Sequence, residues 1–112
     1  VSMGLQQLNF TLKAENPKDP VKDWFHYGVV GSGDMEVLIE RQELGGAANV
    51  KIVTPVKGFD KVWSMVLERF VKESRLGNVS IEINDNNATP IVASMRLRQA
   101  LAESARDVRE EA

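Results

Sequence analysis

A serine lies between two glycines and ahead of an aspartate in the tetrapeptide Gly31-Ser32-Gly33-Asp34. Apolar residues precede it at positions 28–30, and a run that is apolar except for Glu36 follows it at positions 35–39. Two apolar arms that meet at glycines are typical of strands joined by a tight turn or bulge. Because glycine has no side chain, such a turn would leave the Ser32 hydroxyl accessible. An accessible hydroxyl can either attack a substrate or be the point where a group is attached.

The first of these chemistries, nucleophilic catalysis, requires a base within hydrogen-bond reach of the serine. The single histidine, His26, lies upstream in an extended segment, and at about 3.3 Å per residue this places it roughly 20 Å from Ser32. Asp34 is a poor base for an alcohol because an aspartate pKa is ordinarily about 3.9. The Gly-x-Ser-x-Gly turn of hydrolases is also not matched. We therefore expect no catalytic residue, and the local pattern leaves Ser32 as either the substrate of another enzyme or an ordinary turn residue.

Other candidate sites are weaker. Gly31 and Gly33 lack the third glycine, the following helix and the lysine of a phosphate-binding loop. Asp34 and Glu36 are two carboxylates without further ligands, so we expect no metal site. Arg98 lies close to the apolar stripe of a predicted helix, where it either extends to solvent or meets a phosphate or a partner's carboxylate. Trp24 and Trp63 are expected in the core.

Composition limits the classes of protein that need to be considered. The chain has 112 residues, which predicts one domain over residues 1–112. A net charge of −2 gives no attraction to nucleic acid, and no apolar run is long enough to span a membrane. The chain has no cysteine, which fits a reducing cytoplasm. We expect residues 1–4 to be a remnant ahead of the native start and residues 106–112 to fray.

Alternation of apolar and polar residues predicts five strands. They are expected at residues 5–14, at residues 24–30, at residues 35–41, at residues 50–56 and at residues 78–84. Helical spacing predicts a helix from Phe59, with Trp63, Leu67 and Phe70 on its buried face and Gly77 as its end.

A second helix is predicted to begin with Thr89 as N-cap and Pro90 in its first turn. Its buried stripe is expected to contain Ile91, Met95, Leu101, Ala102 and Ala105. Since the two helices come late in the chain, they are expected to cover one face of a mainly antiparallel sheet. The predicted fold class is α+β, a two-layer sandwich of about five strands and two helices.

The sequence around Ser32 resembles a known family. Residues 30–40 (Val-Gly-Ser-Gly-Asp-Met-Glu-Val-Leu-Ile-Glu) resemble the prosthetic-group attachment motif of the malonate decarboxylase acyl carrier protein, the delta subunit. Residues 53–58 with Trp63, residues 81–85, residues 88–90 and residues 96–101 are similar to later segments of the family in the same order. One departure is Asn87, where the family has glycine; asparagine tolerates a positive φ.

The resemblance implies a carrier and not an enzyme. It implies that Ser32, next to Gly31, Gly33 and Asp34 of the motif, bears a covalently bound 2'-(5''-phosphoribosyl)-3'-dephospho-CoA through a phosphodiester. The thiol of that group would carry acetyl and malonyl thioesters. The implied partners are the acyl transferase and decarboxylase subunits of malonate decarboxylase, a prosthetic-group transferase and a malonyl transferase.

Two alternatives remain beside this interpretation. The carrier of citrate lyase bears the same kind of group on a serine, but the later segments favour the malonate decarboxylase family. A protein of a different class, a small non-catalytic interaction domain, would use Ser32 only as part of a turn.

Overall fold

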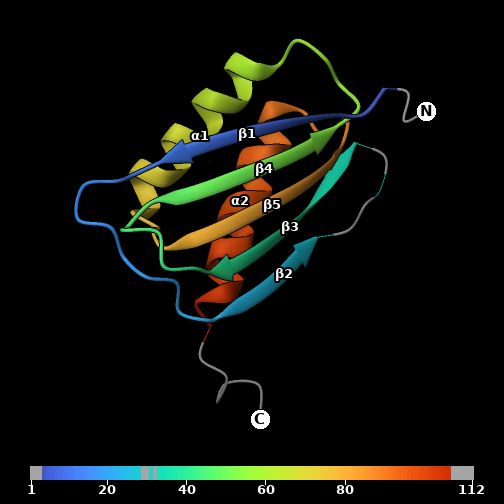
Figure 1. The fold of residues 1–112 in the computed structure, drawn as a ribbon. Helices are drawn as coiled ribbons and strands as arrows, with labels where there is room; N and C mark the ends of the chain where they lie inside the picture. The colour runs from blue at the N-terminus through green and yellow to red at the C-terminus, as the bar shows by residue number, and fades with distance from the viewer. Residues whose placement is uncertain (1–3, 29–30, 32, 107–112) are drawn as a thin grey trace.

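The computed structural model describes residues 4–28, 31 and 33–106, which form five strands and two helices in two layers (Figure 1). The strands are β1 (Gln6–Leu12), β2 (Trp24–Gly28), β3 (Asp34–Arg41), β4 (Ala48–Thr54) and β5 (Val79–Asn86). The helices are α1 (Asp60–Ser74) and α2 (Pro90–Ser104). The predicted order of elements is confirmed, with strand ends shifted by a few residues.

The strands form one sheet in the order β1-β4-β5-β3-β2. Every neighbouring pair is antiparallel except β4 and β5, which are parallel. Parallel neighbours need a crossover connection, and α1 supplies it. Both helices lie on the same face of the sheet, α1 toward β1 and α2 toward β2 and β3 (Figure 1). The predicted α+β sandwich with a mainly antiparallel sheet is therefore confirmed.

The core lies between the sheet and the helices. In β3 the alternation puts Met35, Val37 and Ile39 on the helix side, where each is at most 2% exposed. β4 and β5 contribute Val50, Ile52, Ile81 and Ile83 in the same way. Full burial of such a side chain contributes about 1.5–3 kcal/mol. These three central strands therefore form a rigid base for the connections at their ends.

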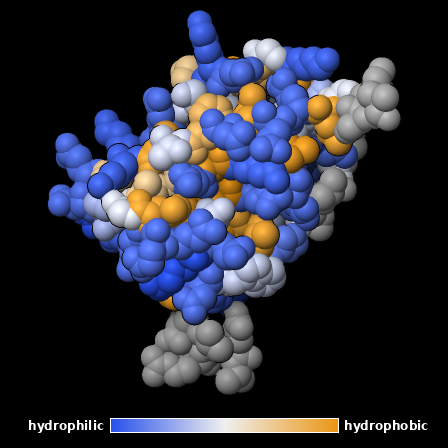
Figure 2. Space-filling model, in the orientation of Figure 1, coloured by the Kyte–Doolittle hydropathy of each residue, from blue (hydrophilic) through white to orange (hydrophobic). Residues whose placement is uncertain are grey.

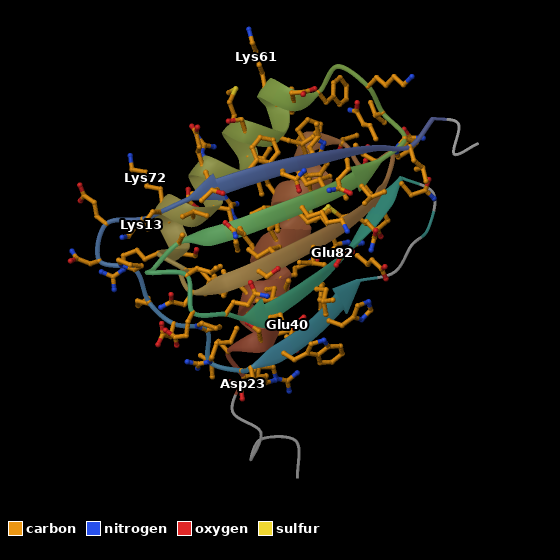
Figure 3. The ribbon with its side chains drawn as sticks, viewed as in Figure 1. Lys13, Asp23, Glu40, Lys61, Lys72 and Glu82 are labelled. Atoms are coloured by element: carbon orange, nitrogen blue, oxygen red, sulfur yellow. The ribbon has the colours of Figure 1, made fainter. Side chains whose placement is uncertain are left out.

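The opposite face of the sheet is open. Figure 2 views this face and shows mainly hydrophilic side chains with hydrophobic ones between them. Glu40 and Glu82 lie on it (Figure 3), and the Lys51 ammonium pairs with the Glu82 carboxylate at 3.8 Å. Among the described residues, no helix is long and apolar enough to cross a membrane.

Helix α1 presents the predicted face, with Trp63, Leu67 and Phe70 buried. Its end differs from the prediction, because Arg75 and not Gly77 takes the left-handed conformation, with φ +58°. Gly77 has another role: a side chain there would collide with the carbonyl oxygen of Gly46. Because Gly77 has no side chain, the loop after α1 can pack against the loop that contains Gly46.

The buried face of helix α2 was predicted wrongly, because the helix turns a different set of side chains toward the sheet. Ile91 and Met95 are 74% and 47% exposed, and the helix residues that the structure buries are Ala93, Leu97, Ala100 and Ser104. Ala102 and Ala105 are exposed, and Leu101 is partly buried. Small residues face the sheet because they let α2 pack closely against it. Trp24 was also wrongly placed in the core; it is 59% exposed on the edge strand β2.

Candidate functional site

The connection between β2 and β3 contains the serine motif. Its closing residues are described, whereas Ser32 lies outside the described residues. The Asp34 amide donates to the carbonyl oxygen of Gly31 at 3.1 Å, and the Gly33 amide donates to the carbonyl oxygen of Asn86 at 2.7 Å. The first bond links the described residues on the two sides of position 32. The second ties Gly33 to the end of the central strand β5.

The glycines of this region do two different things. A Cβ built on Gly28 would lie 2.5 Å from the carbonyl oxygen of Met35, so Gly28 permits the close approach of β2 to β3. A Cβ built on Gly31 or on Gly33 would meet no atom within 4 Å outside its own neighbours. Gly33 also has φ +76°, a conformation that glycine adopts without strain. At positions 31 and 33 the Cβ direction therefore faces open space.

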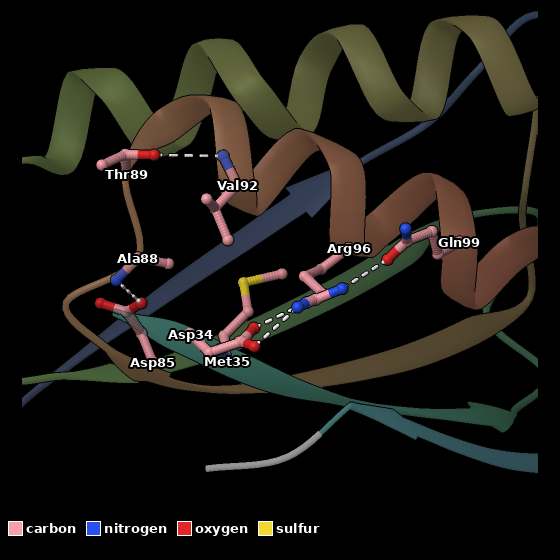
Figure 4. A network of polar contacts seen from close by, with 8 residues as sticks. All are labelled: Asp34, Met35, Asp85, Ala88, Thr89, Val92, Arg96 and Gln99. Atoms are coloured by element: carbon pink, nitrogen blue, oxygen red, sulfur yellow. Dashed lines mark hydrogen bonds and ion pairs between the residues drawn. The ribbon is translucent and has the colours of Figure 1, made fainter. Parts of the chain in front are cut away.

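Asp34, the last residue of the motif, is fixed by helix α2. The Arg96 guanidinium binds its carboxylate at both oxygens, with Nε to Oδ1 at 2.6 Å and Nη2 to Oδ2 at 2.7 Å (Figure 4). The Met35 amide donates to the same Oδ1 at 2.7 Å, and the Gln99 side chain accepts from Nη1 of Arg96 at 2.7 Å. The pair is mostly covered, with 18% of the Asp34 side chain and 29% of the Arg96 side chain exposed.

These contacts change the electrostatics of the motif. The hydrogen bonds from Arg96 and then from the Met35 amide lower the pKa of Asp34 from 3.8 to about 2; burial opposes them, and the positive charge of Arg96 adds a lesser lowering effect. The hydrogen bonding and charge of Asp34 in turn raise the pKa of Arg96. The Asp34 carboxylate is therefore ionised at neutral pH and already paired, which makes it a poorer base than a free aspartate.

A second polar network fixes the same end of the sheet. The buried Asp85 carboxylate accepts from the Thr54 hydroxyl at 2.8 Å and from the Ala88 amide at 2.9 Å. It thereby joins the ends of β4 and β5 to the start of the loop before α2, and Figure 4 shows its contact with Ala88. The next residue, Asn86, is the one whose carbonyl holds the Gly33 amide. The turn thus rests on a strand end that is itself held from two sides.

The connection into α2 follows the sequence prediction. The Thr89 hydroxyl accepts from the Val92 amide at 3.2 Å, so Thr89 is the N-cap, and Pro90 begins the helix. Asn87 takes φ +68° in the preceding turn. These residues set where α2 begins and hence which of its residues faces the motif.

Other residues proposed from the sequence lie apart from the motif. Nε2 of His26 contacts Oε2 of Glu36 at 3.0 Å, and the Asn84 amide donates to Oε1 of the same Glu36 at 2.9 Å. The carboxylates of Asp34 and Glu36 therefore have separate partners. Arg98 is exposed and lies 3.5 Å from Glu73, so it does not reach the motif.

The residue that sequence reasoning missed as a contact of the motif is Arg96. The buried face of α2 was predicted to run through Met95 and Leu101. Arg98 lies next to that face, so Arg98 and not Arg96 was considered as a possible contact. A stripe at residues 93, 97, 100 and 104 also has helical spacing, and it places Arg96 beside the buried Leu97.

Comparison with known proteins identifies the family. Residues 22–104 match the family described as "Malonate decarboxylase delta subunit (MdcD)". The chain is 57% identical over 100 residues to a malonate decarboxylase acyl carrier protein of Malonomonas rubra, covering 89% of each chain. It is 42% identical over 102 residues to one of Burkholderia cepacia, covering 91% of this chain and 93% of the relative.

A solved structure has the same fold. A chain in the crystal structure of a Pseudomonas malonate decarboxylase hetero-tetramer in complex with malonate superposes with a TM-score of 0.78 at 31% identity. The match covers 89% of this chain and 99% of that chain. The family match and the curated relatives decide against the citrate lyase carrier and the unrelated interaction domain. The chain belongs to the malonate decarboxylase acyl carrier protein (delta subunit) family, and it is a carrier subunit without a catalytic role of its own.

Proposed function

We propose that Ser32 is the attachment residue of this carrier and that its oxygen forms a phosphodiester with a phosphoribosyl-dephospho-CoA group. When bound, that group supplies a terminal thiol that holds acetyl and malonyl as thioesters. The chain itself has no cysteine, so it depends on an attached group for a thiol. The proposal thus makes Ser32 the recipient of a modification and not a nucleophile for the decarboxylation.

The observation that carries this proposal is the open space at Gly31 and Gly33. A Cβ built at either position would meet no atom within 4 Å outside its own neighbours. A transferase must bring its own active site to the Ser32 hydroxyl, because among the described residues the motif carboxylate of Asp34 is paired with Arg96 and the single histidine, His26, contacts Glu36. Small residues on both sides of the serine reduce the steric hindrance to such an approach.

The Asp34 and Arg96 pair supports the same role. A phosphodiester adds negative charge within two residues of the Asp34 carboxylate, and like charges at short range repel. The guanidinium of Arg96 compensates the charge of Asp34 through two hydrogen bonds. Asp34 therefore holds the start of β3 in place without leaving an unpaired carboxylate beside the arm.

The partners follow from the carrier role. A chain of similar fold occurs in a malonate decarboxylase hetero-tetramer, and we propose that this chain assembles with the corresponding subunits of its own host. Those subunits supply the acyl transferase and decarboxylase activities, while a separate transferase attaches the group and a malonyl transferase supplies malonyl. A tethered acyl group is present at high effective concentration near each active site that it visits.

Intact-mass spectrometry of the chain purified from its own host tests the proposal. We expect an adduct of the mass of phosphoribosyl-dephospho-CoA on the wild type and on Ser64→Ala, and none on Ser32→Ala. Ser64 is a suitable control because its hydroxyl lies on α1 and bonds only Glu68 among the described residues. An unmodified wild-type chain from a host that expresses the transferase would contradict the proposal.

A further inference from the structure

The helix layer has an apolar groove between α1 and α2 on the side away from the sheet. Its exposed apolar residues are Met65 on α1 and Ile91 and Met95 on α2, which are 69%, 74% and 47% exposed. Single exposed apolar side chains are normal on a protein surface, whereas several that gather in one groove mark an interaction site. The phase of α2 places Ile91 and Met95 there instead of in the core.

The rim of this groove is positively charged. Arg69 and Lys72 of α1 and Arg98 of α2 line it, against a single lining carboxylate, that of Glu68. Glu68 accepts a hydrogen bond from the Ser64 hydroxyl. Within the described part of the chain, Arg69 and Lys72 form no ion pair, and Lys72 extends outward from α1 (Figure 3). The groove is thus cationic although the whole chain has a net charge of −2.

The open face of the sheet is different. Its polar groups bind one another, as in the contacts of Glu36 with His26 and Asn84 and of Lys51 with Glu82. A partner there would have to replace contacts that already exist. In the groove, an acidic partner would gain contacts with Arg69 and Lys72, which have no carboxylate partner among the described residues, whereas Arg98 already contacts Glu73 at 3.5 Å.

We propose that this groove, defined by Met65, Ile91 and Met95 with Arg69, Lys72 and Arg98, docks an acidic surface with apolar side chains on another subunit of the decarboxylase. The proposal rests on the proposed assembly of this chain with those subunits. The serine turn belongs to the sheet layer, at the β2–β3 connection, whereas the groove belongs to the helix layer (Figure 1). Docking through the helices holds the carrier while the turn stays available to successive active sites.

The test measures binding of the full chain to the remaining subunits, purified together from the host without the carrier. We expect Ile91→Asp and Lys72→Glu each to raise the dissociation constant at least tenfold. The matched controls are Val21→Asp, at a residue 68% exposed in a loop, and Lys51→Glu on the open face. Both controls should bind within twofold of wild type, and circular dichroism establishes that all four variants are folded.

Several results would overturn the proposal. One is wild-type affinity in both groove variants. Another is an equal loss in the controls. A third is a dimer in analytical ultracentrifugation that Ile91→Asp disperses, since the occupant would then be a second copy of this chain.

The docking proposal and the attachment proposal can fail separately. The binding assay is repeated in a Ser32→Ala background, which has no arm, and there the groove variants should show the same fold-loss of affinity as they do in the wild type. If groove variants lose binding while the wild type lacks the adduct, docking stands and attachment fails. If the adduct is present and groove variants bind normally, attachment stands and docking fails.

Discussion

The carboxylate of Asp34 and the guanidinium of Arg96 form a two-point ion pair between residues 62 positions apart. Asp34 ends the serine motif and begins β3, whereas Arg96 lies in the middle of α2. A bidentate arginine–carboxylate pair fixes both distance and orientation. The turn that contains the motif is consequently held by the helix layer as well as by its neighbouring strands.

This pair predicts a pH dependence of stability. The folded pKa of Asp34 is about 2, below the ordinary 3.8. A lowered folded pKa gives stability that is present above the unfolded pKa and is lost as pH falls from about 4 toward 2. Thermal melts of wild type and Asp34→Asn should differ most at pH 7 and converge near pH 2. A difference that stays constant from pH 7 to pH 2 would show that the charge of Asp34 is not the cause.

Substitution by alanine should destabilise the protein at Gly28 but have little effect at Gly31. Gly28→Ala should lower the free energy of unfolding by about 2 kcal/mol or more, because φ is +93° and the added Cβ would approach the Met35 carbonyl oxygen. Gly31→Ala should change it by no more than about 0.5 kcal/mol, because the new methyl group meets open space. Urea unfolding measures both. Equal losses would mean that Gly31 is also required by the fold.

Much of the fold could be predicted from periodicity. Residues 78–84 alternate so regularly that β5 could be placed within two residues at each end, and Thr89-Pro90 located the start of α2. The order of strands in the sheet was not predictable, because it depends on contacts between distant segments. The parallel pairing of β4 with β5, for example, follows from α1 crossing between them.

The errors have physical causes. In α2 the large side chains Ile91 and Met95 suggested the buried stripe, but close packing against the sheet favours the small Ala93 and Ala100. Gly77 was predicted to end α1, yet it serves a close contact with Gly46. At the site, the motif residues could be named from the sequence. The pairing of Asp34 with Arg96 could not, because it joins a turn to a helix that follows much later.

The corrected phase of α2 gives a direct comparison. Leu97 is fully buried, so Leu97→Ala should cost about 2–5 kcal/mol of unfolding free energy. Met95→Ala should change it by about 0.5 kcal/mol or less, since Met95 is exposed in the groove. Chemical denaturation measures both values. A larger loss for Met95→Ala than for Leu97→Ala would instead support the buried face that was predicted from the sequence.

The hydrogen bond between Asp85 and Thr54 predicts that the stability effects of substituting these two residues are not additive. Asp85→Ala should cost about 2–3 kcal/mol, because the Thr54 hydroxyl and the Ala88 amide both lose their acceptor. Thr54→Val removes one of these donors. The double variant should therefore lose less than the sum of the two single variants. Strict additivity in urea unfolding would indicate that the two side chains do not interact.

The most direct test of the central claim locates the modification on the chain. Cleavage after Lys22 and Arg41 releases residues 23–41, in which Ser32 is the only serine and there is no threonine. Fragmentation of this peptide from the host-purified protein should place the phosphoribosyl-dephospho-CoA adduct on Ser32. An adduct on a different residue, or an unmodified peptide from a host that expresses the transferase, would contradict the account.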